Sequence, residues 1–220
     1  MIYFRNVSVS FDNVPVLDRV SFHVGPGEFV CLVGQSGVGK TTILRLIYFD
    51  LLPDRGEVLV NETASSSIGK NEIPLLRRKL GIVFQDFKLL DDRNVYENVA
   101  VALRVTGTRP EDIGRRVLRV LADVGLSHKR NSMPGNLSGG EQQRVVIARS
   151  IVNNPIVLLA DEPTGNLDTA SSWEILQILR DINAGGTAVV LASHNEEIVR
   201  KSGGRVLRVT DGRVSGEPAG

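Results

Sequence analysis

The sequence predicts an α/β fold, in which a mostly parallel sheet carries helices, with an antiparallel β part near the N-terminus and an inserted helical part. Three observations indicate this fold class: strand-like alternation early in the chain, nearly continuous apolar runs later, and helical patterns that follow those runs. At 220 residues the chain is long enough for one well-buried core. We therefore expect a single domain over residues 1–220.

The early part of the chain has the pattern of strands that are buried on one face only. The stretches “IYFRNVSVSF”, “VLDRVSFHV” and “EVLVN” alternate apolar and polar residues. Alternation with a period of two is typical of half-exposed strands. These stretches predict an antiparallel sheet.

Four later runs, “FVCLVG”, “GIVF”, “IVLLA” and “AVVLAS”, are almost continuously apolar. Parallel strands that are buried on both faces have this composition. Helical patterns follow at 42–49 and 170–182, so strand and helix alternate as in an α/β core. The single cysteine, Cys31, lies inside the first run, where we expect a small core residue rather than a ligand or a nucleophile.

A helical insertion is expected between the second and third of these runs, at about 86–135. The stretches “VYENVAVALRV” and “EDIGRRVLRVLADVGL” are helical in pattern. The second of them places its apolar side chains on one face, as a helix packed on a core requires; these residues are Ile113, Val117, Leu121 and Val124.

Net charge and the length of the apolar runs argue against a nucleic-acid-binding protein and against a membrane-spanning one. The net charge is +1, which gives no indication of a nucleic-acid partner. The longest apolar runs fall far short of the roughly 18 residues that a membrane-spanning helix needs. From these features alone, we expect a soluble cytoplasmic protein.

The stretch “GQSGVGKTT” fits the P-loop pattern, and it follows a predicted strand and opens a predicted helix. Glycines let successive backbone N–H groups point at phosphate oxygens. Lys40 would supply a point charge to the β- and γ-phosphates, and the Thr41 hydroxyl could bind Mg²⁺. An ordinary turn with an incidental lysine is the weaker alternative. The predicted nucleotide-binding residues here are Gly34, Gln35, Ser36, Gly37, Val38, Gly39, Lys40, Thr41 and Thr42.

Two carboxylates, Asp161 and Glu162, end the apolar run “IVLLA”. An ionised carboxylate beside buried aliphatic residues is costly unless a cation compensates it. Asp161 is therefore a candidate ligand for Mg²⁺, and Glu162 could orient or deprotonate an attacking water. The alternative is that both carboxylates cap the following turn.

His194 and Gln85 follow two of the other apolar runs. Taken alone, a histidine at the end of a strand is more often structural than catalytic, and a glutamine there indicates no function. Ligands of open α/β sheets bind outside the carboxyl ends of the strands, where these residues would meet the P-loop and the two carboxylates. Their convergence predicts one site.

A second glycine-rich helix start, “LSGGEQ”, spans residues 137–142. Ser138, Gly139 and Gly140 offer a hydroxyl and backbone N–H groups that could bind an anion. The alternative is an ordinary N-cap, because Ser138 and Glu141 have the spacing of a capping box. Both interpretations can hold together.

The ordered set of P-loop, Gln85, “LSGGEQ”, “IVLLADE”, “GNLD” and His194 resembles an ABC-type ATPase domain over essentially the whole chain. The resemblance implies an ATPase in which two chains sandwich two ATP molecules head to tail. Each ATP would lie on the P-loop of one subunit and be covered by the “LSGGEQ” loop of the other.

The resemblance also implies roles for single residues. Glu162 would polarise the hydrolytic water, with His194 and Gln85 sensing the γ-phosphate and Mg²⁺. Asp168 would reach across the dimer. Phe11 stands where the family usually places an aromatic residue that stacks on adenine, and a strand residue facing the core is the alternative. The implied catalytic residues are Glu162, His194 and Gln85, and the implied metal ligands are Thr41, Gln85 and Asp161.

The stretches “FQDFKLL”, “VYENV” and “LLADEPTGNLD” are most similar to the cell-division branch of this family. That implies a subunit attached to the cytoplasmic side of the inner membrane through an integral membrane partner, controlling cell-wall hydrolases. ATPases of lipoprotein release or macrolide-type efflux are the alternative, and a scaffold without turnover is a third. Candidate contacts for the partner are Phe87, Leu89, Leu90 and Tyr96, with core packing as the alternative for each.

Overall fold

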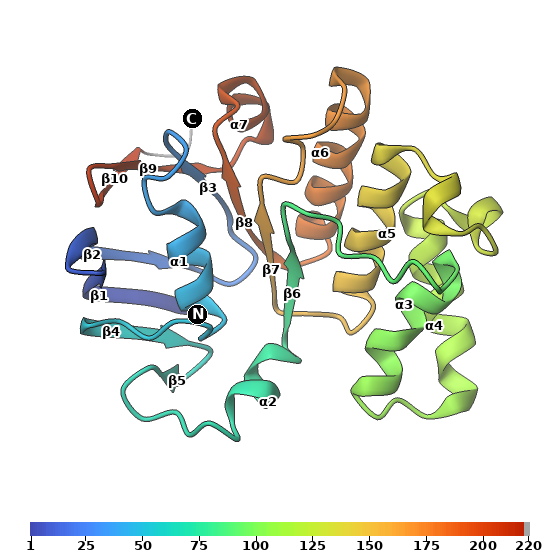
Figure 1. Cartoon of the computed structure of the whole chain (residues 1–220), viewed down its shortest axis with the longest axis horizontal. Coiled ribbons are helices and arrows are strands. Elements are labelled where there is room, and N and C mark those ends of the chain that lie inside the picture. Colours follow the sequence, from blue (N-terminus) through green and yellow to red (C-terminus); the bar gives the residue numbers. More distant parts are fainter. Residues whose placement is uncertain (218–220) are drawn as a thin grey trace.

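The computed structural model describes residues 1–217, which form two β-sheets with helices between and beside them (Figure 1). The first sheet is antiparallel and has the order β2-β1-β4-β5. Its strands are β1 (Ile2–Phe11), β2 (Val14–Val24), β4 (Arg55–Val60) and β5 (Thr63–Ala64). The predicted N-terminal antiparallel sheet is therefore confirmed.

The second sheet has six strands in the order β10-β9-β3-β8-β7-β6, and all are parallel except β10, which pairs antiparallel with β9. The four apolar runs supply β3, β6, β7 and β8, as predicted. The strands are β3 (Phe29–Val33), β6 (Leu80–Val83), β7 (Val157–Asp161), β8 (Ala188–Ser193), β9 (Arg205–Thr210) and β10 (Arg213–Glu217).

The parallel sheet is buried on both faces. Along β3, Val30 and Leu32 pack with α1 (Lys40–Ile47) and the antiparallel sheet, whereas Cys31 and Val33 pack with helices on the opposite face. Those helices include α5 (Gly139–Ile151), α6 (Thr169–Ala184) and α7 (Glu196–Ser202). Cys31 is fully buried, as expected of a core thiol. Double-sided burial explains why these strands are continuously apolar.

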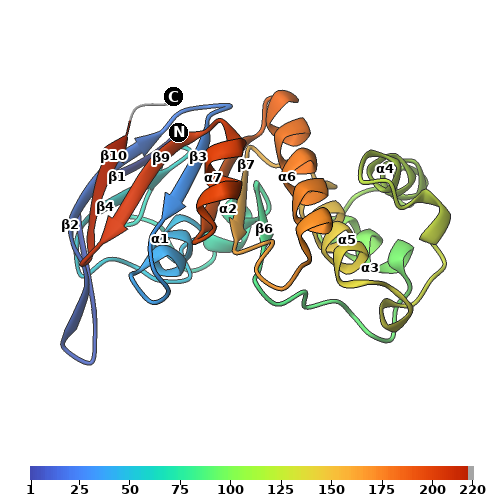
Figure 2. The ribbon, with the colours of Figure 1, turned by 90° about the horizontal axis from the view of Figure 1, so that it is seen from above.

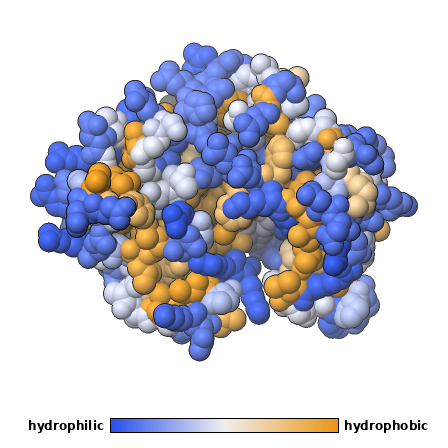
Figure 3. Space-filling model, in the orientation of Figure 1, coloured by the Kyte–Doolittle hydropathy of each residue, from blue (hydrophilic) through white to orange (hydrophobic). Residues whose placement is uncertain are grey.

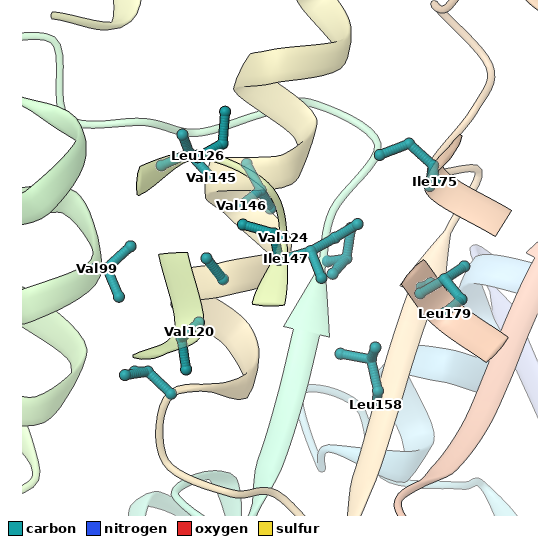
Figure 4. Packing of buried hydrophobic residues seen from close by; sticks show 14 of the residues in the cluster. Val99, Val120, Val124, Leu126, Val145, Val146, Ile147, Leu158, Ile175 and Leu179 are labelled. Atoms are coloured by element: carbon teal, nitrogen blue, oxygen red, sulfur yellow. The ribbon is translucent and has the colours of Figure 1, made fainter. Parts of the chain in front are cut away.

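The segment between β6 and α5 is helical and lies at the far end of the molecule from the antiparallel sheet (Figure 2). It holds α3 (Val95–Val105), α4 (Pro110–Asp123) and the 3₁₀ turns η1 (Ser127–Lys129) and η2 (Pro134–Asn136). The four apolar residues predicted for one face are all buried. Figure 4 shows Val124 beside Val145, Val146 and Ile147 of α5. The remaining short helix, α2 (Ile73–Arg77), precedes β6.

The first helix begins two residues before the predicted start at residue 42. Gly39 is its N-cap residue, with a φ of 107° that disfavours a side chain. A Cβ atom at Gly39 would also lie 2.9 Å from Cδ2 of Leu17. The helix therefore starts at Lys40, directly on the end of the glycine loop, which places the lysine in the first turn.

Within residues 1–217, none of the helices combines the length and apolar character needed to cross a membrane.

Candidate functional site

A cavity of about 830 Å³ opens at the carboxyl edge of the parallel sheet. The predicted residues that line it are Gly34, Gln35, Ser36, Gly37, Val38, Gly39, Lys40, Thr41, Thr42, Gln85, Asp161, Glu162 and His194. They come from the segments that follow β3, β6, β7 and β8, from the end of β7, and from the first turn of α1. Parallel strands bring their carboxyl ends to one edge, so residues far apart in the sequence meet here.

The glycine loop requires its glycines at defined points. Gly37 has a φ of 82°, and a Cβ atom at Gly34 would collide with the carbonyl oxygen of Val209 on β9. Lys40 folds back under the loop, where its Nζ donates hydrogen bonds to the carbonyl oxygens of Gly34 (2.8 Å) and Gln35 (3.0 Å). The loop therefore holds a buried cation at the start of a helix, an arrangement suited to phosphate.

The Glu162 carboxylate lies between two basic groups. Its Oε1 is 3.3 Å from Nζ of Lys40, and its Oε2 is 2.9 Å from Nδ1 of His194. Its backbone N–H donates to the carbonyl oxygen of Ala192 (2.9 Å), and its φ of 46° is unusual for a residue other than glycine. Strained backbone of this kind is concentrated at functional sites. The backbone of Glu162 is thus held by β8, and its carboxylate contacts the lysine of the P-loop.

Asp161 lies beside the helix that follows the P-loop. The Thr41 hydroxyl donates a 2.8 Å hydrogen bond to its Oδ2, while its Oδ1 is buried without a partner among the described residues. Burial raises the pKa of Asp161 above its ordinary value of 3.8, and the neighbouring Glu162 charge adds to the effect. A buried carboxylate oxygen without a partner fits a cation ligand.

The donor set at this point suits a hard divalent cation. Thr41 offers a hydroxyl, Asp161 a carboxylate and Gln85 an amide oxygen at the same cavity. Mg²⁺ prefers oxygen ligands and usually binds one or two protein carboxylates together with substrate phosphates. The residues present therefore fit Mg²⁺ bound together with a nucleotide.

The second glycine-rich loop does not line this cavity. Ser138 is the N-cap of α5: its Oγ accepts from the Glu141 N–H (3.2 Å), and the Glu141 carboxylate accepts from the Ser138 N–H (2.8 Å). The capping box is therefore present, as the alternative interpretation required. Ser138 is exposed, whereas Gly140 is buried. Within one chain, the two predicted phosphate-facing loops are separate.

Asp168 is the N-cap of α6. Its carboxylate accepts hydrogen bonds from the Ser171 N–H (2.9 Å) and hydroxyl (2.7 Å), which lower the pKa of Asp168. Ser171 in turn packs against Gly140, where an added Cβ would lie 2.8 Å from the serine Oγ. Contacts within the chain thus connect the Asp168 loop with the start of α5.

Phe11 lies apart from the cavity. It is at the end of β1, next to the Asp12–Asn13 turn of the β1–β2 hairpin, and this hairpin projects from the body of the molecule (Figure 2). Its side chain is 39% exposed, so it does not face the core, and it is not among the residues that line the cavity.

Part of the cavity wall had no signal in the sequence. Glu196 and the segment 208–211 line it beside the P-loop. The segment reaches the cavity because β9 pairs with β3, with Arg208 opposite Val33. No local motif marks these positions, and only the strand order identifies them.

Comparison with known proteins shows the family to which the chain belongs. The family model described as ABC transporter matches residues 17–165. The chain is 52% identical over 215 residues to the cell division ATP-binding protein FtsE of Bacillus subtilis (strain 168), covering 97% of this chain and 94% of that protein. It is 44% identical over 217 residues to FtsE of Escherichia coli (strain K12), covering 98% of each.

Solved structures show the same fold. A dimeric, post-hydrolysis state of the ATP-binding cassette MJ0796 bound to ADP and Pi superposes with a TM-score of 0.88 at 34% identity, covering 99% of this chain and 98% of that one. The cbiO1 protein of Clostridium perfringens, part of an ABC transporter complex, has a TM-score of 0.90 at 30% identity, covering 97% and 86%.

Proposed function

Because this chain belongs to the ABC transporter family, we propose that it binds ATP on the loop of residues 34–42 and hydrolyses it to ADP and phosphate. The observation that carries the proposal is the placement of Glu162 between Lys40 and His194 in the wall of the P-loop cavity. These three groups supply a fixed cation, a carboxylate base and a group that orients the base.

The chemistry follows from these positions. The backbone N–H groups of the loop and the Lys40 ammonium would bind the β- and γ-phosphates. The Glu162 carboxylate would then orient a water molecule and accept a proton from it as the water oxygen bonds to the γ-phosphorus. The bond from that phosphorus to the oxygen bridging the β- and γ-phosphates would break at the same step, and ADP would leave with the electron pair. His194 would keep that carboxylate in place through Nδ1. Mg²⁺, when bound by Thr41, Asp161 and Gln85, would supply positive charge that offsets the phosphate charge.

The complete site would be formed by two copies of the chain. Ser138 and its neighbours lie outside the P-loop cavity, so in a single chain they have no phosphate to bind. In a head-to-tail dimer, the exposed start of α5 in one copy would cover the triphosphate held by the other. The dimeric ATP-binding cassette to which this chain is similar supports that assembly. The Asp168 loop would lie in the same interface.

The similarity to cell division ATP-binding proteins supports a role in bacterial division. In this role the chain would bind the cytoplasmic side of the inner membrane through an integral membrane partner, FtsX. ATP binding and hydrolysis would change the conformation of FtsX and so regulate peptidoglycan hydrolases outside the membrane.

A hollow between the α1–α2 side and the α3 side of the molecule, with apolar residues along it, is the surface we assign to FtsX (Figure 3). Of the four candidate contacts, Leu90 is 38% exposed. Phe87, Leu89 and Tyr96 are partly buried against the core, so each combines core packing with the exposure that a contact requires.

The ATPase of a lipoprotein-release or macrolide-efflux transporter is the alternative function, since such ATPases share “PTGNLD”.

Two measurements test the proposal. Purification of the chain from membranes, followed by identification of the integral membrane protein bound to it, should recover FtsX. Replacing the chain in cells by its Leu90→Asp variant should reduce that recovery and give filamentous cells. Recovery of a transporter subunit, with lipoprotein mislocalisation or drug sensitivity on depletion, would favour the alternative. An absence of ATP turnover would contradict both.

A further inference from the structure

The second glycine-rich loop carries a full negative charge at its helix start. The Glu141 carboxylate is held there by the Ser138 N–H through the capping box, and this hydrogen bond lowers the pKa of Glu141. A helix N-terminus attracts anions through its free N–H groups, but a carboxylate at the same place repels them. On its own, Glu141 would oppose the arrival of a triphosphate.

A lysine lies against this carboxylate. Nζ of Lys129 is 3.2 Å from Oε1 of Glu141, and the two side chains are 32% and 16% exposed. The single positive charge of Lys129 balances the single negative charge of Glu141. The partial positive charge of the helix start then remains for an incoming anion.

The position of Lys129 is set by the fold. Lys129 lies in η1, where its N–H donates to the carbonyl oxygen of Leu126 (3.0 Å) and its own carbonyl oxygen accepts from the Ser132 N–H (2.8 Å). Leu126 is fully buried in the core. Arg130, the residue after η1, is hydrogen-bonded to α3, because its carbonyl oxygen accepts from the Tyr96 N–H (2.9 Å). The lysine therefore extends from a fixed backbone toward Glu141.

We infer that Lys129 is a positioning residue of the second loop: its ammonium neutralises Glu141 so that the helix start at Ser138 can receive the triphosphate presented by a second copy of the chain. This inference rests on the proposed dimer. It assigns to Lys129 an effect on assembly and turnover, and no effect on the nucleotide affinity of the chain's own P-loop.

The test is a double-variant cycle of Lys129→Met and Glu141→Gln. Methionine keeps the apolar stem of lysine without its charge, and glutamine keeps the capping box. Dimerisation with a non-hydrolysable ATP analogue would be followed by sedimentation, and binding to the monomer by titration at low protein concentration. Lys70→Met, in an exposed loop, is the matched control.

We expect Lys129→Met to dimerise about tenfold more weakly, because the uncompensated charge acts at both sites of a symmetric dimer. Its monomer should bind the analogue as tightly as the unmodified chain, and Lys70→Met should behave as the unmodified chain. Adding Glu141→Gln should restore dimerisation, which a merely structural role for the lysine would not produce.

Normal dimerisation of Lys129→Met would overturn the inference, as would a double variant no better than Lys129→Met alone. If the unmodified chain itself remained monomeric with saturating analogue, the proposed dimer would fail instead. The two failures are thus distinguishable.

Discussion

The ammonium nitrogen of Lys40 lies 3.3 Å from Oε1 of Glu162, and the two side chains are only 6% and 12% exposed. The cation that would bind the triphosphate and the base that would accept the proton of the attacking water are thus partners in the same cavity. Phosphate oxygens would compete with Glu162 for Lys40. Binding of the nucleotide and release of the base are therefore linked.

Replacing Glu162 by glutamine should separate binding from turnover. The amide keeps the volume of the side chain but cannot accept a proton, so we expect turnover to fall by roughly 10²- to 10⁴-fold. ATP should still bind, because the P-loop and Lys40 are intact. Phosphate release and nucleotide titration measure the two effects. Turnover equal to that of the unmodified chain would show that Glu162 is not the base.

Asp161→Asn should stabilise the fold while it impairs Mg²⁺-dependent turnover. The carboxylate has one buried oxygen without a partner among the described residues. Such an oxygen lowers the free energy of unfolding by about 1 kcal/mol or more. Removing its charge should raise the Tm by roughly 2–4 °C at pH 7. Thermal unfolding measures this difference, and an Asp161→Asn chain that is less stable at pH 7 would contradict the account.

The same variant should show a defined pH dependence. Burial raises the pKa of Asp161 above 3.8, so the folded chain binds this proton more tightly than the unfolded chain. The cost of the charge is complete above the raised pKa, is lost as the pH falls through that pKa, and is absent below 3.8, where both the folded and the unfolded chain bind the proton. The Tm advantage of Asp161→Asn should therefore shrink on acidification. An advantage that grew at lower pH would be inconsistent with this sign.

Gly140→Ala should destabilise the contact between α5 and α6. The new Cβ would lie 2.8 Å from Oγ of Ser171 and 3.0 Å from its Cβ, and overpacking of this kind costs about 1–3 kcal/mol. In a Ser171→Gly background the same change should cost much less, because both clashing atoms are gone. Chemical unfolding of the four chains measures the coupling. Equal costs in both backgrounds would mean that the helices do not meet as described.

The sequence predicted those parts of the molecule that depend on local pattern. Continuous apolar runs identified the parallel strands, because burial on both faces leaves no polar positions. The P-loop was found because its glycines and Lys40 act within one short segment. Hydrophobic periodicity places the start of its helix two residues too late, because the backbone conformation of Gly39 decides where the helix begins.

Other features depend on contacts between distant segments, which no periodicity encodes. Asn98 has the pattern of an ordinary helix residue, yet it is fully buried and its side chain binds the backbone of Leu90 and Arg93. The pairing of Lys129 with Glu141 is of the same kind. Strand order alone brings Arg208 to the cavity.

The shared site is tested most directly by mixing two inactive chains. Lys40→Ala removes the cation of the P-loop, and Ser138→Arg blocks the exposed start of α5, so each chain alone should lack ATP turnover. In a mixed dimer, one of the two sites would combine an intact P-loop with an intact Ser138 loop.

We predict that an equal mixture regains turnover, up to about a quarter of the unmodified rate, because half of the dimers are mixed and each has one intact site. The rate should rise with total protein concentration. If each chain held a complete site, mixing would restore nothing. A mixture as inactive as either variant would contradict the account.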